Sequence, residues 1–169
     1  NEQLSIGDTL DVMPPNGTFY TEVNPTKAKN YIAFAAGSGI TPLLSIIKTH
    51  LASEPNSTFK LFYLNGTVKS IIFKEEIEQL KNLYFNRFEV FYFLTKEHRS
   101  SELFNGRFSK EKLQVLTDKI IDISTTDECF ICGPEDMIFL LRDELVNAGL
   151  PKEHIHFELF TTGLTEEDK

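Results

Sequence analysis

Five short apolar segments alternate along the chain with amphipathic helical patterns, and this alternation restricts the fold more than any other feature. The apolar segments are rich in β-branched and aromatic residues, which favour strands. Alternation of strands and helices is typical of a parallel sheet with helices on both faces. We therefore predict a Rossmann-like three-layer α/β/α domain with a five-stranded parallel sheet. The predicted strands are 31–36, 58–64, 88–95, 128–132 and 155–160.

Local signals indicate where the helices between these strands begin and end. Thr41 followed by Pro42 predicts the first turn of the first helix, with Thr41 as its N-cap. The second helix is predicted over residues 70–84, the third opens at Ser109, and Gly149 closes the fourth. The apolar stripe predicted for the second helix consists of Ile72, Phe73, Ile77, Leu80 and Leu83.

The beginning of the chain does not follow this alternation of strands and helices. Residues 6–12 alternate apolar and polar side chains as an antiparallel strand does, and residues 14–17 are rich in turn-forming types. We therefore predict that residues 1–23 are the tail of a preceding β domain and that residues 24–162 form the α/β domain. The acidic residues of 163–169 predict a solvated linker or tail.

Acidic residues outnumber basic ones by 25 to 17, which gives a formal net charge of −8. A chain that binds nucleic acid through its phosphates needs the opposite balance. A transmembrane helix needs roughly 20 consecutive apolar residues, and no run in the sequence approaches that length. We therefore expect neither a nucleic-acid partner nor a membrane partner.

The chain has two cysteines, Cys129 and Cys132, which are too few for a disulfide framework. This usage favours a reducing, cytoplasmic location. Their C-x-x-C spacing also occurs in redox and zinc sites. Here both cysteines lie in a predicted strand, where residues three apart point to opposite faces. The four histidines supply no matching pair of ligands, so we expect no metal site.

Two glycine-containing turns, at 37–42 and 132–134, follow the first and fourth predicted strands. In an open parallel sheet, ligands bind outside the carboxyl ends of the strands where the order of winding reverses. Backbone N–H groups of the first turn can face a pyrophosphate because glycine has no Cβ. Taken alone, the first turn is better interpreted as a plain tight turn, and a lone cysteine such as Cys132 as a buried apolar side chain. Together they favour a dinucleotide site with Cys132 beside the nicotinamide.

The two turns resemble the pyridine-nucleotide domain of the ferredoxin–NADP reductase superfamily. Within it, the chain is most similar to reductases of oxygenase systems, such as that of phenylacetyl-CoA epoxidase. The resemblance runs in one order over roughly residues 4–162, which makes it more specific than any single motif. The segments that carry it are A-A-G-S-G-I-T-P at 35–42, C-G-P-E-D-M at 132–137, D-T-L-D-V-M-P-P at 8–15, I-I-F-K-E-E at 71–76 and H-F-E-L-F at 156–160.

This resemblance implies a role for individual residues. The turn at 37–42 would hold the pyrophosphate and ribose, and Cys132 would lie against C4 of the nicotinamide, where the hydride leaves. Glu158 and Phe160 would be the acid and the aromatic that lie near flavin and nicotinamide, although Glu158 is equally an ordinary surface residue and Phe160 a core residue. The implied nucleotide-binding residues are Gly37, Ser38, Gly39, Ile40, Thr41, Pro42, Asn65, Gly66, Thr67, Lys69, Ser70, Phe73, Gly133, Pro134, Met137 and Phe160.

The choice between NADPH and NADH depends on the end of the second strand. An acid there commonly holds the ribose 2′-hydroxyl, whereas a cation holds a 2′-phosphate. No acid occurs between Asn65 and Glu75. Relatives often have Arg at the position of Gly66, so Lys69, with Thr67 and Ser70, is left as the phosphate ligand. These residues favour NADPH, with NADH as the alternative.

Reductases of this superfamily contain further domains whose motifs this sequence lacks. Neither the R-x-Y-S/T signature of the flavin domain nor the C-x₄-C-x₂-C motif of a plant-type 2Fe–2S domain occurs. We therefore expect a segment of a longer oxidoreductase. It would be the NAD(P)H module that passes hydride to FAD, and onward to an iron–sulfur centre, ferredoxin or oxygenase, in phenylacetate-type aromatic degradation.

In this interpretation residues 1–23 are the end of the flavin-binding β domain. FAD and the 2Fe–2S cluster are implied for the full-length protein only, on the same or another chain. Two alternatives remain open: a nucleotide-binding module without catalysis, and a docking subunit that works with a separate flavoprotein.

Overall fold

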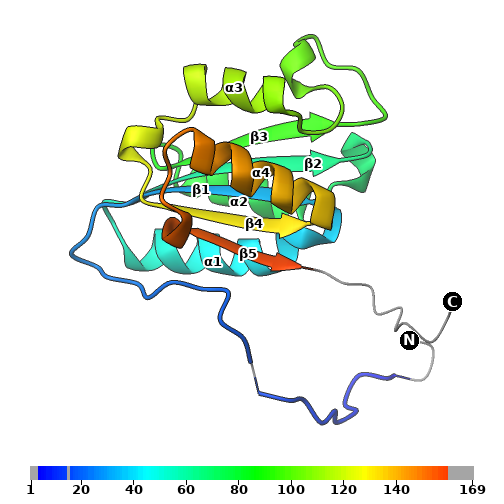
Figure 1. Ribbon diagram of the computed structural model, residues 1–169. Coiled ribbons are helices and arrows are strands. Elements are labelled where there is room, and N and C mark those ends of the chain that lie inside the picture. Colours follow the sequence, from blue (N-terminus) through cyan, green and yellow to red (C-terminus); the bar gives the residue numbers. More distant parts are fainter. Residues whose placement is uncertain (1–3, 15, 160–169) are drawn as a thin grey trace, which may run out of the picture.

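The computed structural model describes residues 4–14 and 16–159, and this part of the chain contains five strands and four α-helices (Figure 1). The sheet is parallel throughout with the order β3-β2-β1-β4-β5, so the predicted fold class is confirmed. The strands are β1 (Asn30–Ala36), β2 (Thr58–Asn65), β3 (Phe88–Leu94), β4 (Glu128–Gly133) and β5 (Ile155–Leu159). The helices are α1 (Ile40–Ser53), α2 (Lys74–Leu83), α3 (Lys110–Lys119) and α4 (Glu135–Asn147).

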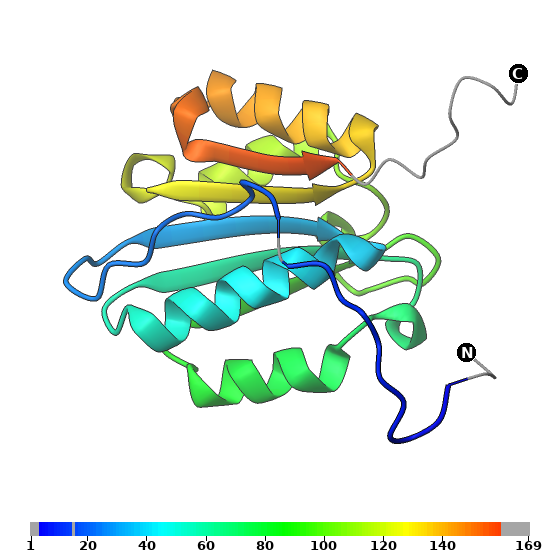
Figure 2. The same cartoon turned by 90° about the horizontal axis from the view of Figure 1, so that it is seen from below.

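The helices cover both faces of the sheet and divide the core into two halves. Helices α1 and α2 lie on one face, and α3 and α4 lie on the other (Figures 1 and 2). Alternate residues of each strand enter opposite halves. In β1, Ala33 packs towards α1 and Phe34 packs towards α3 and α4. Both residues have no exposed surface, as expected for a strand that is covered on both faces.

The winding order reverses between β1 and β4, which pair directly in the register Ala35 with Cys132. From β1 the chain continues outward through β2 to β3, and from β4 it continues to β5 on the other side. The carboxyl ends of all five strands point to one edge of the sheet (Figure 1). The two glycine-containing turns therefore lie side by side at the switch point, as predicted.

Helix α1 begins earlier than the sequence predicts, so the prediction of Thr41 as N-cap is wrong. Residues Gly37–Gly39 form a 3-10 turn, and Gly39 already has helical dihedral angles, φ −59° and ψ −10°. The helix therefore starts at Ile40 without a break. The Thr41 hydroxyl donates a hydrogen bond to the Ser38 carbonyl at 2.9 Å instead of capping.

Helix α2 is shorter than predicted because the chain bends sharply at Phe73. Phe73 has φ 56°, in the left-handed region, and is the N-cap of α2. A short 3-10 turn, Val68–Ser70, occupies the segment that was predicted as the first helical turn. Of the predicted stripe only Ile77 is buried in the helix, whereas Ile72, Phe73 and Leu83 are 39%, 44% and 70% exposed. The prediction of these three residues as core is wrong.

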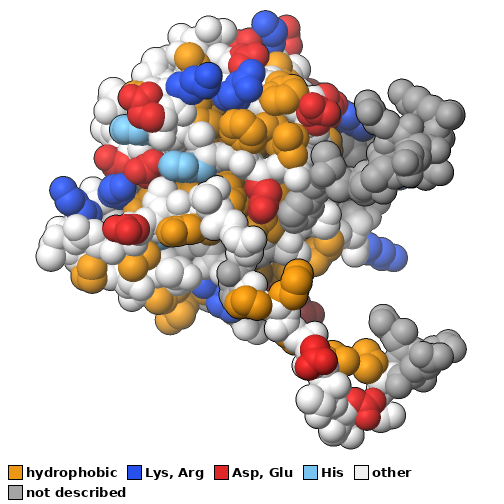
Figure 3. All heavy atoms as spheres, turned by 60° about the horizontal axis from the view of Figure 1, so that its bottom comes forward, with side chains coloured by type: hydrophobic (Ala, Val, Ile, Leu, Met, Phe, Trp, Pro, Cys, Tyr) orange, Lys and Arg blue, Asp and Glu red, His pale blue; other side chains and the backbone are white. Residues whose placement is uncertain are grey.

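The N-terminal segment contains no strand within residues 4–14 and 16–29, so the predicted strand over residues 6–12 is wrong for this chain. Instead residues 4–14 run as an extended arm away from the sheet, with apolar side chains along it (Figure 3), whereas Phe19 packs against the core. A lone arm has no neighbouring strand to complete its backbone hydrogen bonds. The exposed apolar residues of the arm are Leu4, Ile6, Leu10, Val12 and Met13.

None of the helices in the described ranges is long and apolar enough to cross a membrane.

Candidate nucleotide-binding site

The two turns at the switch point approach each other so closely that side chains are excluded between them. A Cβ on Gly39 would overlap the carbonyl oxygen of Cys132. A Cβ on Gly133 would lie 2.5 Å from Met137 Cε and 3.0 Å from the Cβ of Ala36. Gly39 thus allows the turn after β1 to pack directly against the end of β4.

Gly37 serves a different purpose in the same turn. Its φ is +52°, and a Cβ built on it would meet nothing within 4 Å. The residue therefore supplies a left-handed conformation at the edge of an open space. The buried Tyr63 hydroxyl donates a 2.9 Å hydrogen bond to the Gly37 carbonyl, which fixes the turn to β2. Burial raises the pKa of Tyr63 to about 12, so this hydroxyl remains a donor at physiological pH.

A pocket of about 310 Å³ lies at this edge, beside the two turns. It is lined from the carboxyl ends of β2 and β3 on one side and from the start of α4 on the other. Six of the predicted site residues line it: Gly37, Asn65, Gly66, Ser70, Pro134 and Met137. Six further lining residues were not predicted: Leu64, Thr95, Arg107, Phe108, Asp136 and Leu140.

Asn65 lines this pocket and carries a buried hydrogen-bond donor. The residue is only 5% exposed, and its Nδ2 has no hydrogen-bond partner among the described residues. A buried amide without a partner costs about 1–3 kcal/mol. The Nδ2 atom is buried, so a ligand oxygen would reach this donor only after the side chain turns towards the pocket.

Cys132 and Glu158 are neighbours on β4 and β5 because they pair directly in register. Their side chains therefore lie on the same face of the sheet, the face covered by α1. The Cys132 thiol has no exposed surface, and burial, together with the Glu158 charge, raises its pKa to about 12. It is therefore a neutral thiol at physiological pH.

Cys129 belongs to the opposite half of the core, as the strand periodicity predicts. Burial raises the pKa of this thiol well above its ordinary value. The structure therefore separates the C-x-x-C pair across the sheet. Within residues 4–14 and 16–159, no group of three or more His, Cys, Asp or Glu residues is placed to hold a metal ion.

Thr67, Lys69 and Phe73 do not line the pocket, although Thr67 and Lys69 belong to the turn that ends at the lining residue Ser70. Thr67 and Ser70 cap the 3-10 turn reciprocally, with the Ser70 hydroxyl donating to the Thr67 carbonyl at 2.8 Å. Lys69 is exposed in the same turn, and Phe73 follows it with its left-handed backbone. Phe160 lies outside the described residues.

The unpredicted lining residues differ in how far the sequence could have indicated them. Thr95 directly follows β3, as Asn65 ends β2, so the rule that parallel strands end at one edge would have found it. Arg107 and Phe108 follow a long polar loop, and no local pattern brings such a loop back to the sheet.

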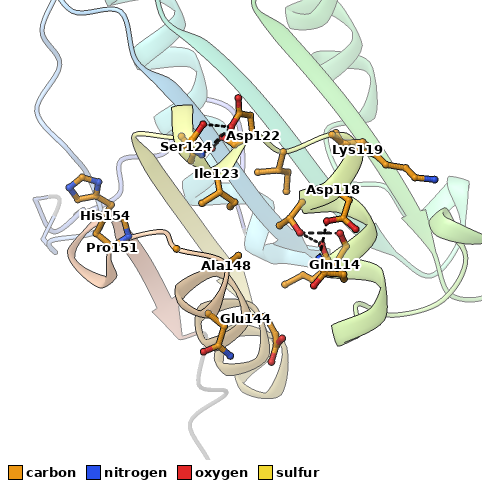
Figure 4. Close-up of a pocket in the computed structure, with 17 residues that line it drawn as sticks. Gln114, Asp118, Lys119, Asp122, Ile123, Ser124, Glu144, Ala148, Pro151 and His154 are labelled. Carbon is orange, nitrogen blue, oxygen red and sulfur yellow. Dashed lines mark hydrogen bonds between the residues drawn. The ribbon is translucent and has the colours of Figure 1, made fainter.

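A second, larger hollow of about 1180 Å³ lies at the opposite edge, between the ends of α3 and α4 (Figure 4). The carboxylates among its lining residues are already paired with neighbouring side chains. Asp122 accepts from Ser124 at 2.6 Å, and Asp118 accepts from Gln114 at 2.8 Å. Glu144 pairs with Lys110 at 2.9 Å. Unlike the pocket at the carboxyl edge, this hollow does not adjoin the two glycine-containing turns.

Comparison with known proteins agrees with this geometry. A family model described as oxidoreductase NAD-binding domain matches residues 34–143. The chain is 40% identical over 161 residues to a component of the 1,2-phenylacetyl-CoA epoxidase of Escherichia coli, covering 95% of this chain and 45% of that protein. It is 30% identical to the ferredoxin reductase component of 3-ketosteroid-9-alpha-monooxygenase of Rhodococcus rhodochrous, covering 95% of this chain and 42% of that protein.

The chain thus spans less than half the length of these relatives. Among solved structures, the cytochrome b5 reductase domain of nitrate reductase from Ulva prolifera has the same fold, with a TM-score of 0.75 at 22% identity. That match covers 93% of this chain and 63% of the other. The matched family model extends from β1 into α4 and so includes both glycine turns. The chain belongs to the oxidoreductase NAD-binding domain family and is an NAD(P)-binding domain of the ferredoxin–NADP reductase type.

Proposed function

We propose that this chain binds NAD(P)H and presents its nicotinamide to a flavin, as the nucleotide module of an electron-transfer reductase. The observation that carries the proposal is the pocket at the switch point. There two turns that exclude side chains meet a buried Asn65 amide without a partner. Backbone N–H donors of glycine turns suit a pyrophosphate because no side chain blocks its approach. A side-chain amide without a hydrogen-bond partner suits a ribose or phosphate oxygen.

Each part of the site has a role in this proposal. The turn of Gly37–Gly39 and the start of α1, including Ile40 and Pro42, hold the pyrophosphate. Asn65, Gly66 and Ser70 hold the adjacent ribose, and Met137 with Pro134 closes the other side. Cys132 and Glu158 lie beneath the nicotinamide and orient it for hydride transfer.

We further propose a preference for NADPH over NADH. The turn after β2 lies beside a lysine, and the carboxylate of Glu97 accepts from the Val68 N–H of the same turn at 3.2 Å. The Lys96 backbone N–H donates to the Gly66 carbonyl at 2.8 Å, and Lys96 Cδ would lie 3.7 Å from a Cβ on Gly66. Asp136 lines the pocket but pairs with Arg107. A lysine beside the second strand suits a 2′-phosphate.

The acceptor flavin belongs, in this proposal, to a β domain that the N-terminal arm joins. The exposed apolar residues of the arm support this because a neighbouring domain would cover them. The similarity to reductases of phenylacetyl-CoA epoxidase and 3-ketosteroid monooxygenase supports an oxygenase system as the user of the electrons. An iron–sulfur centre in the whole protein, and a role in the breakdown of aromatic compounds, are parts of the same proposal.

The role of Cys132 is tested in the flavin-containing full-length reductase by stopped-flow measurement of flavin reduction. Cys132→Ala is expected to slow flavin reduction by about tenfold with little change in nucleotide affinity, because orientation of the nicotinamide is lost. Cys129→Ala is the matched control, since Cys129 is equally buried in the same strand but on the opposite face. Equal rates for the two variants would contradict this role.

A second function is favoured by one observation. Because the Cys132 thiol has no exposed surface, it has no direct path to a ligand in this arrangement. A nucleotide-binding module without hydride transfer would keep such a thiol as a packing residue. Tight nucleotide binding without any flavin reduction by NADPH or NADH in the unmodified full-length protein would favour this function.

A further inference from the structure

Arg107 is the one arginine among the residues that line the candidate pocket, within the described part of the chain. Its side chain is 76% exposed, and one guanidinium nitrogen lies 3.4 Å from Asp136 Oδ2. Asp136 lies in the first turn of α4 and lines the same pocket. The pair therefore joins the loop after β3 to α4. An exposed ion pair of this length contributes only about 0–1 kcal/mol, so it opens readily.

The backbone of Arg107 is held much more firmly than its side chain. Next to it, Phe108 is 6% exposed and packs against Phe34 and Phe93, with ring centroids 5.5 and 4.7 Å apart. On its other side, the Gly106 N–H donates to the Leu94 carbonyl at 2.7 Å. The loop is thus fixed to the end of β3 while the guanidinium stays free to move.

The side chain of Lys112, on α3, also holds this backbone in place through hydrogen bonds. Its ammonium group donates to the carbonyl of Arg107 at 3.0 Å and also to the carbonyl of Asn105. Gly106 between them has φ +73°, and a Cβ there would lie 3.6 Å from Lys112 Nζ. The Lys112 ammonium group therefore holds the backbone carbonyls on both sides of Gly106, the left-handed residue that precedes Arg107.

We propose that Arg107 binds a phosphate group of the nucleotide, that Asp136 holds it in the absence of nucleotide, and that Lys112 is the residue that positions it. The inference rests on the proposed nucleotide function. Arginine binds phosphate through two parallel N–H donors, which is stronger than an exposed pair with one carboxylate. The phosphate therefore displaces Asp136, and the unpaired Asn65 amide in the same pocket offers a further donor.

The test measures the affinity of the 169-residue chain for NADPH and for NADH by isothermal titration calorimetry. Arg107→Gln is expected to weaken binding about tenfold or more, because it removes a charge-assisted hydrogen bond. Asp136→Asn is expected to tighten binding about two- to fivefold and to have no effect when Arg107 is already Gln. Arg142→Gln is the matched control, since Arg142 pairs with its neighbour Asp143 on α4 and does not line the pocket.

Comparison of the affinities for NADPH and NADH identifies which phosphate group Arg107 binds. A loss with NADPH alone assigns Arg107 to the 2′-phosphate, and an equal loss with both nucleotides assigns it to the pyrophosphate. Affinity of Arg107→Gln within twofold of the unmodified chain for both nucleotides would overturn the inference and leave the proposed function intact. An unmodified chain that binds neither nucleotide would overturn the proposed function itself.

Lys112 is tested by coupling, because a merely structural residue would weaken binding independently of Arg107. Lys112→Met is expected to weaken binding in the unmodified background and to add less than about twofold in Arg107→Gln. Lys112→Arg, which can still donate to both carbonyls, is expected to restore affinity. Additive losses in the double variant would contradict the positioning role.

Discussion

At the scale of single residues, the two glycines of the first turn meet opposite demands. Gly37 needs a left-handed backbone beside open space, whereas Gly39 has ordinary helical dihedral angles but no space for a Cβ. A sequence shows only two glycines, and the contrast between conformation and packing becomes visible when β4 is placed beside the turn.

This contrast predicts different effects for two identical substitutions. Gly39→Ala is expected to lower the free energy of unfolding by about 2–3 kcal/mol, because its Cβ meets backbone atoms of Cys132. Gly37→Ala is expected to lower it by about 1 kcal/mol, from the left-handed conformation alone. Urea denaturation of both variants measures the difference. Equal losses would show that the close approach of the two turns is not the constraint.

The two thiols provide a second prediction at this scale. Both have no exposed surface, and burial raises both pKa values above the ordinary range. The thiolate is the form that reacts with alkylating reagents. Neither cysteine should be modified by iodoacetamide at about pH 8 in the folded chain, and both should react in urea, as measured by mass spectrometry. Rapid labelling of Cys132 in the folded chain would show that its thiol opens to solvent.

At the scale of elements, the segment before β1 is fixed to the end of α1 by a buried carboxylate. Glu54 has no exposed surface and accepts from the Asn24 N–H at 2.8 Å, the Ser57 hydroxyl at 2.8 Å and the Tyr31 hydroxyl at 2.9 Å. His50 packs on the Tyr31 ring, with its Nδ1 3.5 Å from Glu54 Oε1, too far for a good hydrogen bond.

Removing this carboxylate charge should loosen the segment. Glu54→Gln is expected to lower the free energy of unfolding by about 2–3 kcal/mol, since one side-chain oxygen is replaced by an amide that cannot accept. Glu76→Gln is the control, because the exposed pair of Glu76 with Lys48 also joins two elements but should contribute less than about 1 kcal/mol. Similar losses in urea denaturation would contradict the account of the buried carboxylate.

The same cluster predicts how stability depends on pH. Burial lowers the pKa of His50 from 6.5, against the opposing effect of the Glu54 charge. Burial alone would raise the pKa of Glu54, but its hydrogen-bond donors outweigh this effect and lower the pKa from 4.5. Groups with depressed folded-state pKa values stabilise the fold above their unfolded-state values and lose this effect on acidification.

Stability should therefore fall as pH decreases from about 7, first through His50 below about 6.5 and then through Glu54 below about 4.5. Urea denaturation as a function of pH measures this slope. His50→Gln is expected to flatten its upper part. An unchanged slope in that variant would exclude His50 as the titrating group.

The strands and the helix order could be predicted from the sequence because they depend on local periodicity and glycine position. Gly149, for example, has φ +107° and follows Ala148, the C-cap of α4, as its place in the sequence predicts. The starts of α1 and α2 could not be predicted in this way. Phe73 takes a left-handed backbone that no propensity of phenylalanine indicates, and the helix starts four residues later than predicted.

At the scale of the whole molecule, the site results from the winding of the chain. Gly37, Asn65, Thr95 and Pro134 are far apart in sequence, and they meet because parallel strands end at one edge. This rule predicted the meeting of the two glycine turns. It did not predict Arg107, which returns to the edge through a long loop held by Lys112 and Phe108.

The central claim is that a pyridine nucleotide binds between the two turns at the carboxyl edge of the sheet. A titration of the ¹⁵N-labelled 169-residue chain with NADP⁺, followed by amide chemical shifts, tests it most directly. The account predicts saturable shifts in the backbone amides of residues 37–40 and 135–137 and in the Asn65 side-chain amide. The absence of saturable shifts at millimolar nucleotide, or shifts confined to the hollow of Figure 4, would contradict it.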